Sequence, residues 1–374
     1  MNSASAVSTS SASMTAADVA ARHLLAILEG PSSRKTTLIV GIQGPQGIGK
    51  STLVKNLVSK LANFPTGRSI RAAALSIDDL YLPHKSLLEL KERHPQNGLL
   101  HGRGLPGTHD VKLGSEILSE VKRASIGTKS RSIRLPVYDK SLHDGAGDRT
   151  EEATWPALEL RPRMSGSNEE NSNDSKDHVP PLDVFLLEGW CLGFRPLPDD
   201  VVKSKYEEAL RLRESRGTSL SSAFELDQPL HFTLRHSLDS LLEVNEKLRQ
   251  YESEWYPHID TFIQLWPASE SPAVEERANE EYKALDAFPS SAKALVFQWR
   301  LEAEHWMKKN VSKGKGMTDD QVKDFVARYM PAYELFSGGQ LGSVEGDRSG
   351  SERSSGLRIE LDEKRAVVHH QTLM

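Results

Sequence analysis

The sequence has one cysteine and no long apolar run. With Cys191 alone among 374 residues, an internal disulfide is excluded, and the chain fits a reducing compartment. No apolar run approaches the roughly 18 residues that a membrane span needs. The Ser- and Ala-rich start has no basic residue before Arg22, unlike a typical transit peptide. We therefore expect no membrane segment and a cytoplasmic location, with the nucleus as the alternative.

The sequence also lacks an excess of basic residues. It contains 47 Lys and Arg against 52 Asp and Glu, which gives a net charge of -5. Nothing supplies the domain-wide basic field of a general nucleic-acid binder, so basic residues must act locally. We expect no nucleic-acid partner, and the oligomeric state is left open.

One short stretch carries a phosphate-binding pattern. "VGIQGPQGIGKSTL" (40–53) meets G-x-x-x-x-G-K-[ST] between an apolar run and a segment with helical spacing. Its glycines let backbone N–H groups converge on an anion at a helix N-terminus. Lys50 would reach the β- and γ-phosphates of ATP, and Ser51 would ligate Mg²⁺. The predicted cofactor-binding residues are Gly44, Pro45, Gln46, Gly47, Ile48, Gly49, Lys50, Ser51 and Thr52.

Four apolar runs predict a parallel sheet. "TTLIVGI", "IRAAALSI", "LDVFLLEGW" and "DTFIQLW" are near-continuous, as the strands of a buried parallel sheet require. Ligands of such sheets bind beyond the carboxyl ends of the strands, so Asp78 and Glu188 should emerge beside the phosphate-binding loop. We expect an α/β fold of the P-loop NTPase type, with a parallel sheet between helices and with loop insertions.

Polar, low-complexity segments divide the chain. Such segments bury too little apolar surface to offset the entropy of ordering. They predict a disordered tail over 1–14, a domain over 15–336 with a mobile insertion at 164–181, a flexible linker over 337–356, and a strand or hairpin over 357–374 that returns to the sheet.

Capping residues and spacing predict three helices. Thr15 is the expected N-cap of the first. Thr318 and Gln321 form a capping box at the start of the last. Between them, a helical periodicity from Ala292 to Trp306 predicts one apolar face that packs in the core.

A phosphate-binding loop alone permits an ATPase motor, a GTPase switch or a small-molecule kinase. No Asn/Thr-Lys-x-Asp motif for reading guanine follows the third strand. The stretch "LSIDDLY" places Asp78 and Asp79 where a strand meets the nucleotide pocket. A kinase needs a carboxylate that orients the acceptor hydroxyl and takes its proton. Asp78 or Asp79 suits this role, and capping of a helix is the alternative for both.

Six motifs, taken in order, resemble a known group of kinases. They are "GPQGIGKSTL", "SIDDLYL", "RGLPGTHD", "PVYDKSLHDGAGDR", "FLLEGW" and "FVARYMPAYELF". Together they resemble the fungal glycerate-kinase-like P-loop proteins. More widely they are similar to the superfamily of uridine kinase, phosphoribulokinase, type I pantothenate kinase and plant-type D-glycerate 3-kinase. The likeness covers 36–336. It implies Asp78 as the catalytic aspartate and Glu188 as the acid that holds Mg²⁺ through water.

The resemblance also implies an acceptor side built from two loops. Arg103 would pair with an acceptor carboxylate through its planar fork, while capping of the next helix is the alternative for Asp110. Arg300 is the nearest candidate for a lid arginine, and an ion pair with Glu304 one turn along is its alternative. The predicted substrate-binding residues are Asp79, Tyr81, Arg103, Thr108, His109, Asp110, Tyr138, Asp139, His143, Arg149 and Arg300.

These observations favour an ATP-dependent phosphotransferase that acts on a small hydroxyl-bearing metabolite. Asp78, Lys50 and Glu188 are its expected catalytic residues, Ser51 and Glu188 its expected Mg²⁺ ligands, and ATP its expected phosphate donor. Glycerate is the leading acceptor. A nucleoside- or pantothenate-type kinase and a regulatory P-loop ATPase are the alternatives.

Overall fold

The computed structural model describes nine segments of the chain. These are 14–30, 36–64, 69–163, 179–215, 230–268, 287–288, 290–310, 316–338 and 355–373. Most of the predicted tail, of the insertion at 164–181 and of the linker at 337–356 lies outside the described residues.

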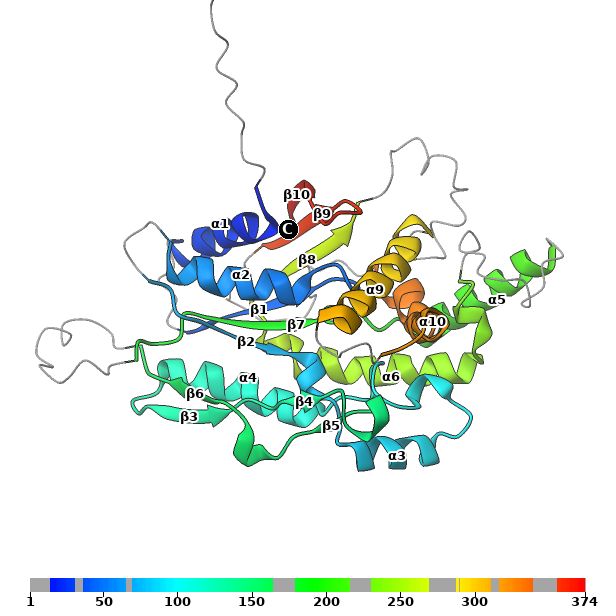
Figure 1. Ribbon diagram of the computed structural model, residues 1–374, viewed down its shortest axis with the longest axis horizontal. Helices are drawn as coiled ribbons and strands as arrows, with labels where there is room; N and C mark the ends of the chain where they lie inside the picture. Colours follow the sequence, from blue (N-terminus) through cyan, green and yellow to red (C-terminus); the bar gives the residue numbers. More distant parts are fainter. Residues whose placement is uncertain are drawn as a thin grey trace, which may run out of the picture.

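A six-stranded sheet forms the centre of the molecule, in the order β10-β9-β8-β1-β7-β2 (Figure 1). The middle strand, β1 (Leu38–Gln43), runs parallel to both β7 (Val184–Gly189) and β8 (Thr261–Pro267). The edge strand β2 (Ala72–Ser76) runs parallel to β7. Every residue of β1 and β7 is buried, as expected for strands covered on both faces. The predicted parallel α/β sheet is confirmed.

A C-terminal hairpin extends this sheet. Strand β9 (Gly356–Leu361) pairs parallel with β8, and β10 (Val367–Leu373) turns back antiparallel to it. The segment after 356 therefore adds two strands to the central sheet.

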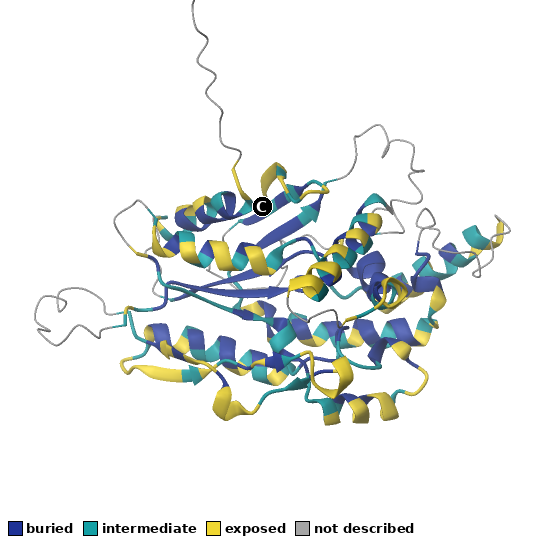
Figure 2. Cartoon of the chain, in the orientation of Figure 1, coloured by how far each residue is buried: buried dark blue, intermediate teal, exposed yellow. Residues whose placement is uncertain are grey.

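Helices cover both faces of the sheet. α1 (Ala16–Leu28) and α2 (Lys50–Ala62) lie on one face, and α4 (Val111–Ile126) and α6 (Leu238–Glu254) lie on the other (Figure 1). The helical faces that meet the sheet are buried and the opposite faces are exposed (Figure 2). Two apolar clusters result, one under α1 and α2 and a larger one on the other face.

The remaining helices frame the end of the sheet where the parallel strands finish, whereas the ribbon that contains residues 157–160 lies at the end where they begin (Figure 1). The helices are α3 (His84–Arg93), α5 (Asp199–Ser215), α9 (Ser290–Asn310) and α10 (Asp319–Phe336). Two small ribbons pair β3 (Arg131–Arg134) with β6 (Ala157–Leu160) and β4 (Tyr138–Asp139) with β5 (Asp148–Arg149). Short 3₁₀ turns are η1 (Ile77–Leu80), η2 (Gly98–Leu100), η3 (His143–Gly145), η4 (Glu152–Thr154), η6 (Thr233–Arg235) and η7 (Tyr256–His258).

The predicted capping residues are confirmed. Thr15 accepts a hydrogen bond from the Asp18 backbone and forms a capping box with it at the start of α1. Thr318 and Gln321 form the second capping box, at the start of α10. No helix in the described part of the chain is both long and apolar enough to cross a bilayer.

The predicted apolar face of α9 is wrong at its last turn. Trp299 is fully buried, but Trp306 is 62% exposed. The buried side chain in that turn is Glu304, which accepts hydrogen bonds from Arg300 at 2.9 Å and from the Met317 backbone at 2.8 Å. The side chain that is buried in this part of α9 is therefore a carboxylate whose hydrogen bonds are satisfied within the chain.

Candidate active site

The phosphate-binding loop connects β1 to α2 and requires two of its glycines. Gly47 has φ 80° and Gly49, the N-cap of α2, has φ 107°, both in the region that disfavours side chains. A Cβ on Gly47 would also lie 2.7 Å from Trp299 of α9. The loop thus presents backbone N–H groups at a helix N-terminus, where an anion is stabilised.

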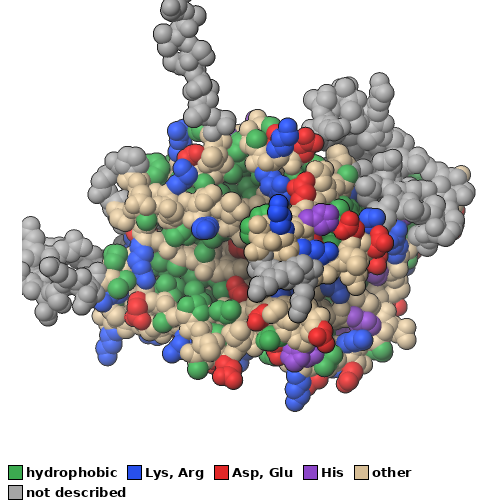
Figure 3. All heavy atoms as spheres, viewed as in Figure 1, with side chains coloured by type: hydrophobic (Ala, Val, Ile, Leu, Met, Phe, Trp, Pro, Cys, Tyr) green, Lys and Arg blue, Asp and Glu red, His purple; other side chains and the backbone are tan. Residues whose placement is uncertain are grey.

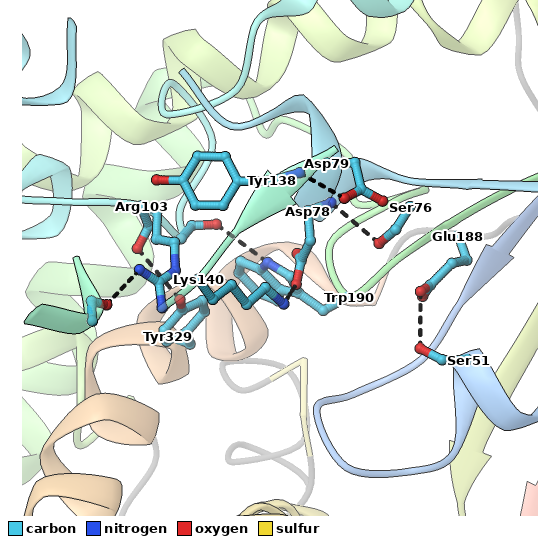
Figure 4. Close-up of polar contacts among 12 residues, drawn as sticks. Ser51, Ser76, Asp78, Asp79, Arg103, Tyr138, Lys140, Glu188, Trp190 and Tyr329 are labelled. Atoms are coloured by element: carbon cyan, nitrogen blue, oxygen red, sulfur yellow. Dashed lines mark hydrogen bonds and ion pairs between the residues drawn. The ribbon is translucent and has the colours of Figure 1, made fainter. Parts of the chain in front are cut away.

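Lys50, Ser51 and Glu188 converge beside this loop. Lys50 Nζ donates to the Pro45 carbonyl at 3.2 Å, and burial lowers the pKa of Lys50 against the opposing effects of Glu188 and Asp78. Ser51 Oγ donates to Glu188 Oε1 at 3.0 Å, and Glu188, near the end of β7, is only 8% exposed (Figure 4). A hydroxyl and a carboxylate are hard oxygen donors, which fit Mg²⁺.

Asp78 lies in η1, directly beyond the end of β2. Ser76 caps this turn by accepting a hydrogen bond from the Asp78 backbone at 3.2 Å. The Asp78 carboxylate pairs with Lys140, with Nζ 2.5 Å from Oδ2. In Figure 4 the Ser51–Glu188 pair lies on one side of Asp78 and Lys140 lies on the other.

The charge of Asp78 is strongly stabilised. Burial by itself would raise the pKa of this carboxyl, but the ammonium of Lys140 outweighs it. His109 and Lys50 act in the same direction as Lys140, and the pKa of Asp78 falls to about 2. Asp78 is therefore ionised throughout the neutral range.

Asp79 has different surroundings, although it is the next residue. Its Oδ1 accepts a hydrogen bond from the Tyr138 backbone at 3.1 Å, which ties β4 to η1. Burial raises the pKa of Asp79, opposed by that hydrogen bond. The two carboxylates thus have different partners: Asp78 pairs with the ammonium of Lys140, and Asp79 holds the backbone of Tyr138.

The surface around these residues is hollowed. Figure 3 shows a hollow below α2, lined in part by hydrophobic side chains along the edge strand β2 and by acidic side chains at its inner end. Asp78 and Glu188 follow β2 and β7 at this edge of the sheet, so the carboxylates lie where a ligand of such a sheet is expected.

Comparisons with known proteins agree with this geometry, although no family model matches the chain. It is 32% identical over 332 residues to the chloroplastic D-glycerate 3-kinase of Arabidopsis thaliana, which covers 88% of this chain and 54% of that protein. It is 32% identical to the probable ATP-dependent kinase TDA10 of Saccharomyces cerevisiae, over 82% of this chain and 79% of the relative. A solved structure of D-glycerate 3-kinase from Cryptococcus neoformans matches with a TM-score of 0.68 and 31% identity, over 96% of this chain and 99% of that one.

The chain belongs to the glycerate-kinase-like P-loop kinases. The resemblance that the six motifs carried is confirmed. This kinase is an ATP-dependent phosphotransferase that acts on a hydroxyl group of a small molecule. It spans about half the length of the plant relative.

Three aromatic rings of the kinase pack together on the acceptor side. Tyr81 stacks on His109 with ring centroids 4.3 Å apart and meets the edge of Tyr138 at 5.4 Å. All three are buried, and burial lowers the pKa of His109 to about 3. Since His109 Nδ1 lies 2.5 Å from the Tyr251 hydroxyl, this histidine is a neutral, hydrogen-bonded part of the wall.

Several predicted acceptor residues hold the loops in place. Asp110 caps α4 through the Leu113 backbone, which was the alternative for this residue, and pairs with Arg149 at 3.0 Å. Arg149 also donates to the Tyr81 carbonyl at 2.8 Å. Thr108 is fully buried and closes its own turn by donating to the Leu105 carbonyl. These side chains build the site's frame, so their roles as substrate ligands remain predictions.

Arg103 and His143 shape the second acceptor-side loop. The guanidinium of Arg103 donates to the carbonyls of Gly145, at 2.7 Å, and Ala146, and it lies over the Tyr138 ring. His143 is exposed, stacks on His84 at 3.9 Å and pairs with Asp148.

Asp139 and Arg300 also have close partners within the chain. Asp139 accepts hydrogen bonds from the Ser141 backbone at 2.8 Å and hydroxyl at 2.6 Å, which closes a local turn. Arg300 forms the alternative ion pair with Glu304 and lies over the Phe325 ring. Its role in a lid remains a prediction.

Sequence reasoning missed five residues that border the site. Lys140 had no motif signal besides its place in "PVYDKS", and Trp190 directly follows the "FLLEG" strand. Tyr329 and Tyr333 lie in the motif "FVARYMPAYELF" but were not predicted as site residues. Tyr333 nevertheless accepts a hydrogen bond from the Gln46 backbone of the P-loop at 3.2 Å. Arg365, in the hairpin turn between β9 and β10, donates to the Gly47 carbonyl at 2.8 Å.

Proposed function

We propose that this kinase transfers the γ-phosphoryl group of ATP to a hydroxyl group of glycerate. The observation that carries the proposal is the ionised Asp78 at the edge of the sheet, next to the P-loop and paired with a cation on its acceptor side. The names of two relatives that match most of this chain, both D-glycerate 3-kinases, support the choice of acceptor.

The nucleotide side consists of the P-loop and its neighbours. Residues 44–52 surround the phosphates of ATP, all but Pro45 carry a backbone N–H group that can donate to them, and Lys50 neutralises part of their charge. Ser51 and Glu188 hold Mg²⁺, which offsets charge on the phosphates when it is bound.

Asp78 is the general base. It takes the proton of the acceptor hydroxyl while that oxygen forms a bond to the γ-phosphorus. The bond from the γ-phosphorus to the β–γ bridging oxygen breaks, so ADP leaves with the electron pair and the proton stays on Asp78 until solvent removes it. A positioned base of this kind contributes roughly 10²–10⁴-fold to a rate.

The acceptor side suits an anion. Lys140 and Arg103 bring two cations to the loop that faces Asp78, and glycerate carries a carboxylate that the ammonium of Lys140 can hold. A neutral sugar or nucleoside has no charged group that would interact with this ammonium.

An ATP-consumption screen tests the function. Purified enzyme with ATP and Mg²⁺ is offered sugar acids, nucleosides and pantothenate, with water as the baseline, and the phosphorylated product is identified by mass spectrometry. We expect turnover with glycerate well above the baseline. Turnover only with a nucleoside or pantothenate would reject glycerate, and ATP hydrolysis that no acceptor stimulates would favour the regulatory ATPase.

A further inference from the structure

We infer that Lys140 is a lock on Asp78 that the acceptor opens: its ammonium holds the base in an ion pair until the carboxylate of the acceptor draws the ammonium away. This inference rests on the proposed function, since it requires an acceptor with a carboxylate. It adds a role to a residue that lies outside the predicted site.

The ion pair is built so that it can open. Lys140 Nζ lies 2.5 Å from Asp78 Oδ2, while the side chains are 54% and 32% exposed. Ion pairs with this much access to water are weak, and one partner can leave without unfolding its surroundings. A lysine is also held by a flexible four-carbon stem, so its ammonium can move several ångströms while its backbone stays in place.

The backbone on each side of Lys140 is fixed. The Tyr138 N–H donates to Asp79, and β4 pairs with β5. Asp139 accepts two hydrogen bonds from Ser141. The side chain of Lys140 is therefore the part of this segment that moves.

The neighbouring arginines are occupied by backbone carbonyls. Arg103 donates to Gly145 and Ala146. Arg328 donates to the carbonyls of His101, at 2.6 Å, and of Arg103, at 2.7 Å. These bonds hold the frame of the acceptor side, so drawing either guanidinium to a substrate would break the loop. Lys140 differs, because its partner is the carboxylate that the acceptor hydroxyl must itself reach.

Displacement of Lys140 would make Asp78 a stronger base at the moment when the acceptor hydroxyl is bound. A carboxylate that is paired with a cation is a poorer base. The ammonium also lies 2.5 Å from Asp78 Oδ2, an oxygen that an acceptor hydroxyl would have to approach. When an acceptor binds, the ammonium moves to its carboxylate and the basicity of Asp78 rises. After the product leaves, the ammonium returns to Asp78 and the basicity falls again. Water brings no carboxylate, so the lock also suppresses ATP hydrolysis in the empty site.

The titratable and charged groups that act on or face Asp78 are Lys140, His109, Lys50, Asp79, Tyr81, Cys191, Tyr329 and Tyr333.

The test compares three variants. Lys140→Met removes the ammonium but keeps most of the stem, and Lys140→Arg keeps a cation. Lys85→Met removes a lysine of the same charge from α3, where the side chain is 89% exposed and pairs with Glu89 at 4.0 Å. Thermal unfolding of each variant confirms that it folds, and ATP hydrolysis without acceptor and transfer to glycerate are measured against pH.

For Lys140→Met we expect acceptor-free ATP hydrolysis to rise above wild type and KM for glycerate to rise roughly 10- to 100-fold, the usual effect of losing a charged hydrogen bond. The acid limb of kcat/KM, which reports the free enzyme, moves up by about 0.5–1 pH unit, because Asp78 loses a partly exposed cation. The acid limb of kcat reports the complex, where Lys140 has already left Asp78, so it stays in place. Lys140→Arg restores the low hydrolysis, and Lys85→Met behaves as wild type.

Several results would overturn the lock. If the acid limbs of kcat and kcat/KM shift together, Lys140 remains on Asp78 in the complex. If acceptor-free hydrolysis does not rise, the pair does not restrain the base. Hydrolysis needs no acceptor, so this measurement separates the two proposals. If the wild-type enzyme does not phosphorylate glycerate, glycerate is rejected as the acceptor. Increased hydrolysis by Lys140→Met would still support the lock with another acceptor that carries a carboxylate.

Discussion

Replacing Asp78 by Asn tests the mechanism most directly. Asn has nearly the same shape and can still accept a hydrogen bond, but it carries no charge and cannot take the proton. We expect phosphoryl transfer to fall by roughly 10²–10⁴-fold, while the affinity for ATP stays within a few-fold of wild type. The expected loss is in kcat, because the base acts in the transition state.

The structure indicates that this substitution costs little stability. The Asp78–Lys140 pair is partly exposed, so its loss amounts to about 0.2–1 kcal/mol. The structure also gives the direction in which the stabilisation by the Asp78 charge changes with pH. The pKa of Asp78 is about 2 in the folded protein against 3.8 for a free carboxyl, so its stabilisation is present above about pH 4 and disappears as pH falls toward 2. At neutral pH a loss of activity in Asp78→Asn therefore reports chemistry.

Single-turnover transfer is the suitable assay, with Asp79→Asn as the matched control. In that variant the amide oxygen of the new side chain can still accept the hydrogen bond from the Tyr138 backbone, so much less activity should be lost. If Asp79→Asn is the crippled variant, the base has been assigned to the wrong carboxylate. If both variants transfer at the wild-type rate, a general base does not operate in this enzyme.

Four other substitutions test three separate parts of the structure. Lys50→Ala should abolish tight binding of ATP and Mg²⁺ in calorimetry without lowering the unfolding temperature, and unchanged affinity would contradict the nucleotide site. Lys293→Met should destabilise the protein by about 3–5 kcal/mol in urea unfolding, since Lys293 and Glu334 pair at 2.8 Å with both side chains fully buried, and an effect below about 1 kcal/mol would contradict this account. Trp299→Ala should cost about 3–5 kcal/mol, whereas Trp306→Ala should stay within about 0.5 kcal/mol because its ring is exposed; equal losses would show that both rings are packed.

Much of the fold could be predicted because its signals are local. The P-loop motif is contiguous, the parallel strands are near-continuous apolar runs, and two of these runs end at carboxylates of the site, Asp78 and Glu188. Since the carboxyl ends of parallel strands meet at one edge, the position of both carboxylates beside the P-loop followed without further information.

Other features depend on partners that sequence spacing does not reveal. Helical periodicity predicted that Trp306 packs in the core. Instead, Glu304 is buried in this part of α9, because Arg300 and the Met317 backbone N–H donate hydrogen bonds to its carboxylate. Lys140 lies in a loop, 62 residues from Asp78, and a single lysine in a polar stretch resembles any solvated charge. Contact of Arg365 with the P-loop spans 318 residues, beyond the reach of any local pattern.

The strand order sets the sequence of events during synthesis. β1 carries the P-loop and is made early, yet it lies between β7 and β8, which begin about 140 and 220 residues later. At roughly 5–20 residues per second, the ribosome needs about 7–28 s to reach β7 and about 11–44 s to reach β8. Throughout this interval both edges of a largely apolar strand lack their native partners, which favours mispairing. We expect the nascent kinase to depend on chaperones in this window and to gain protection from nucleotide only after β8 has joined the sheet.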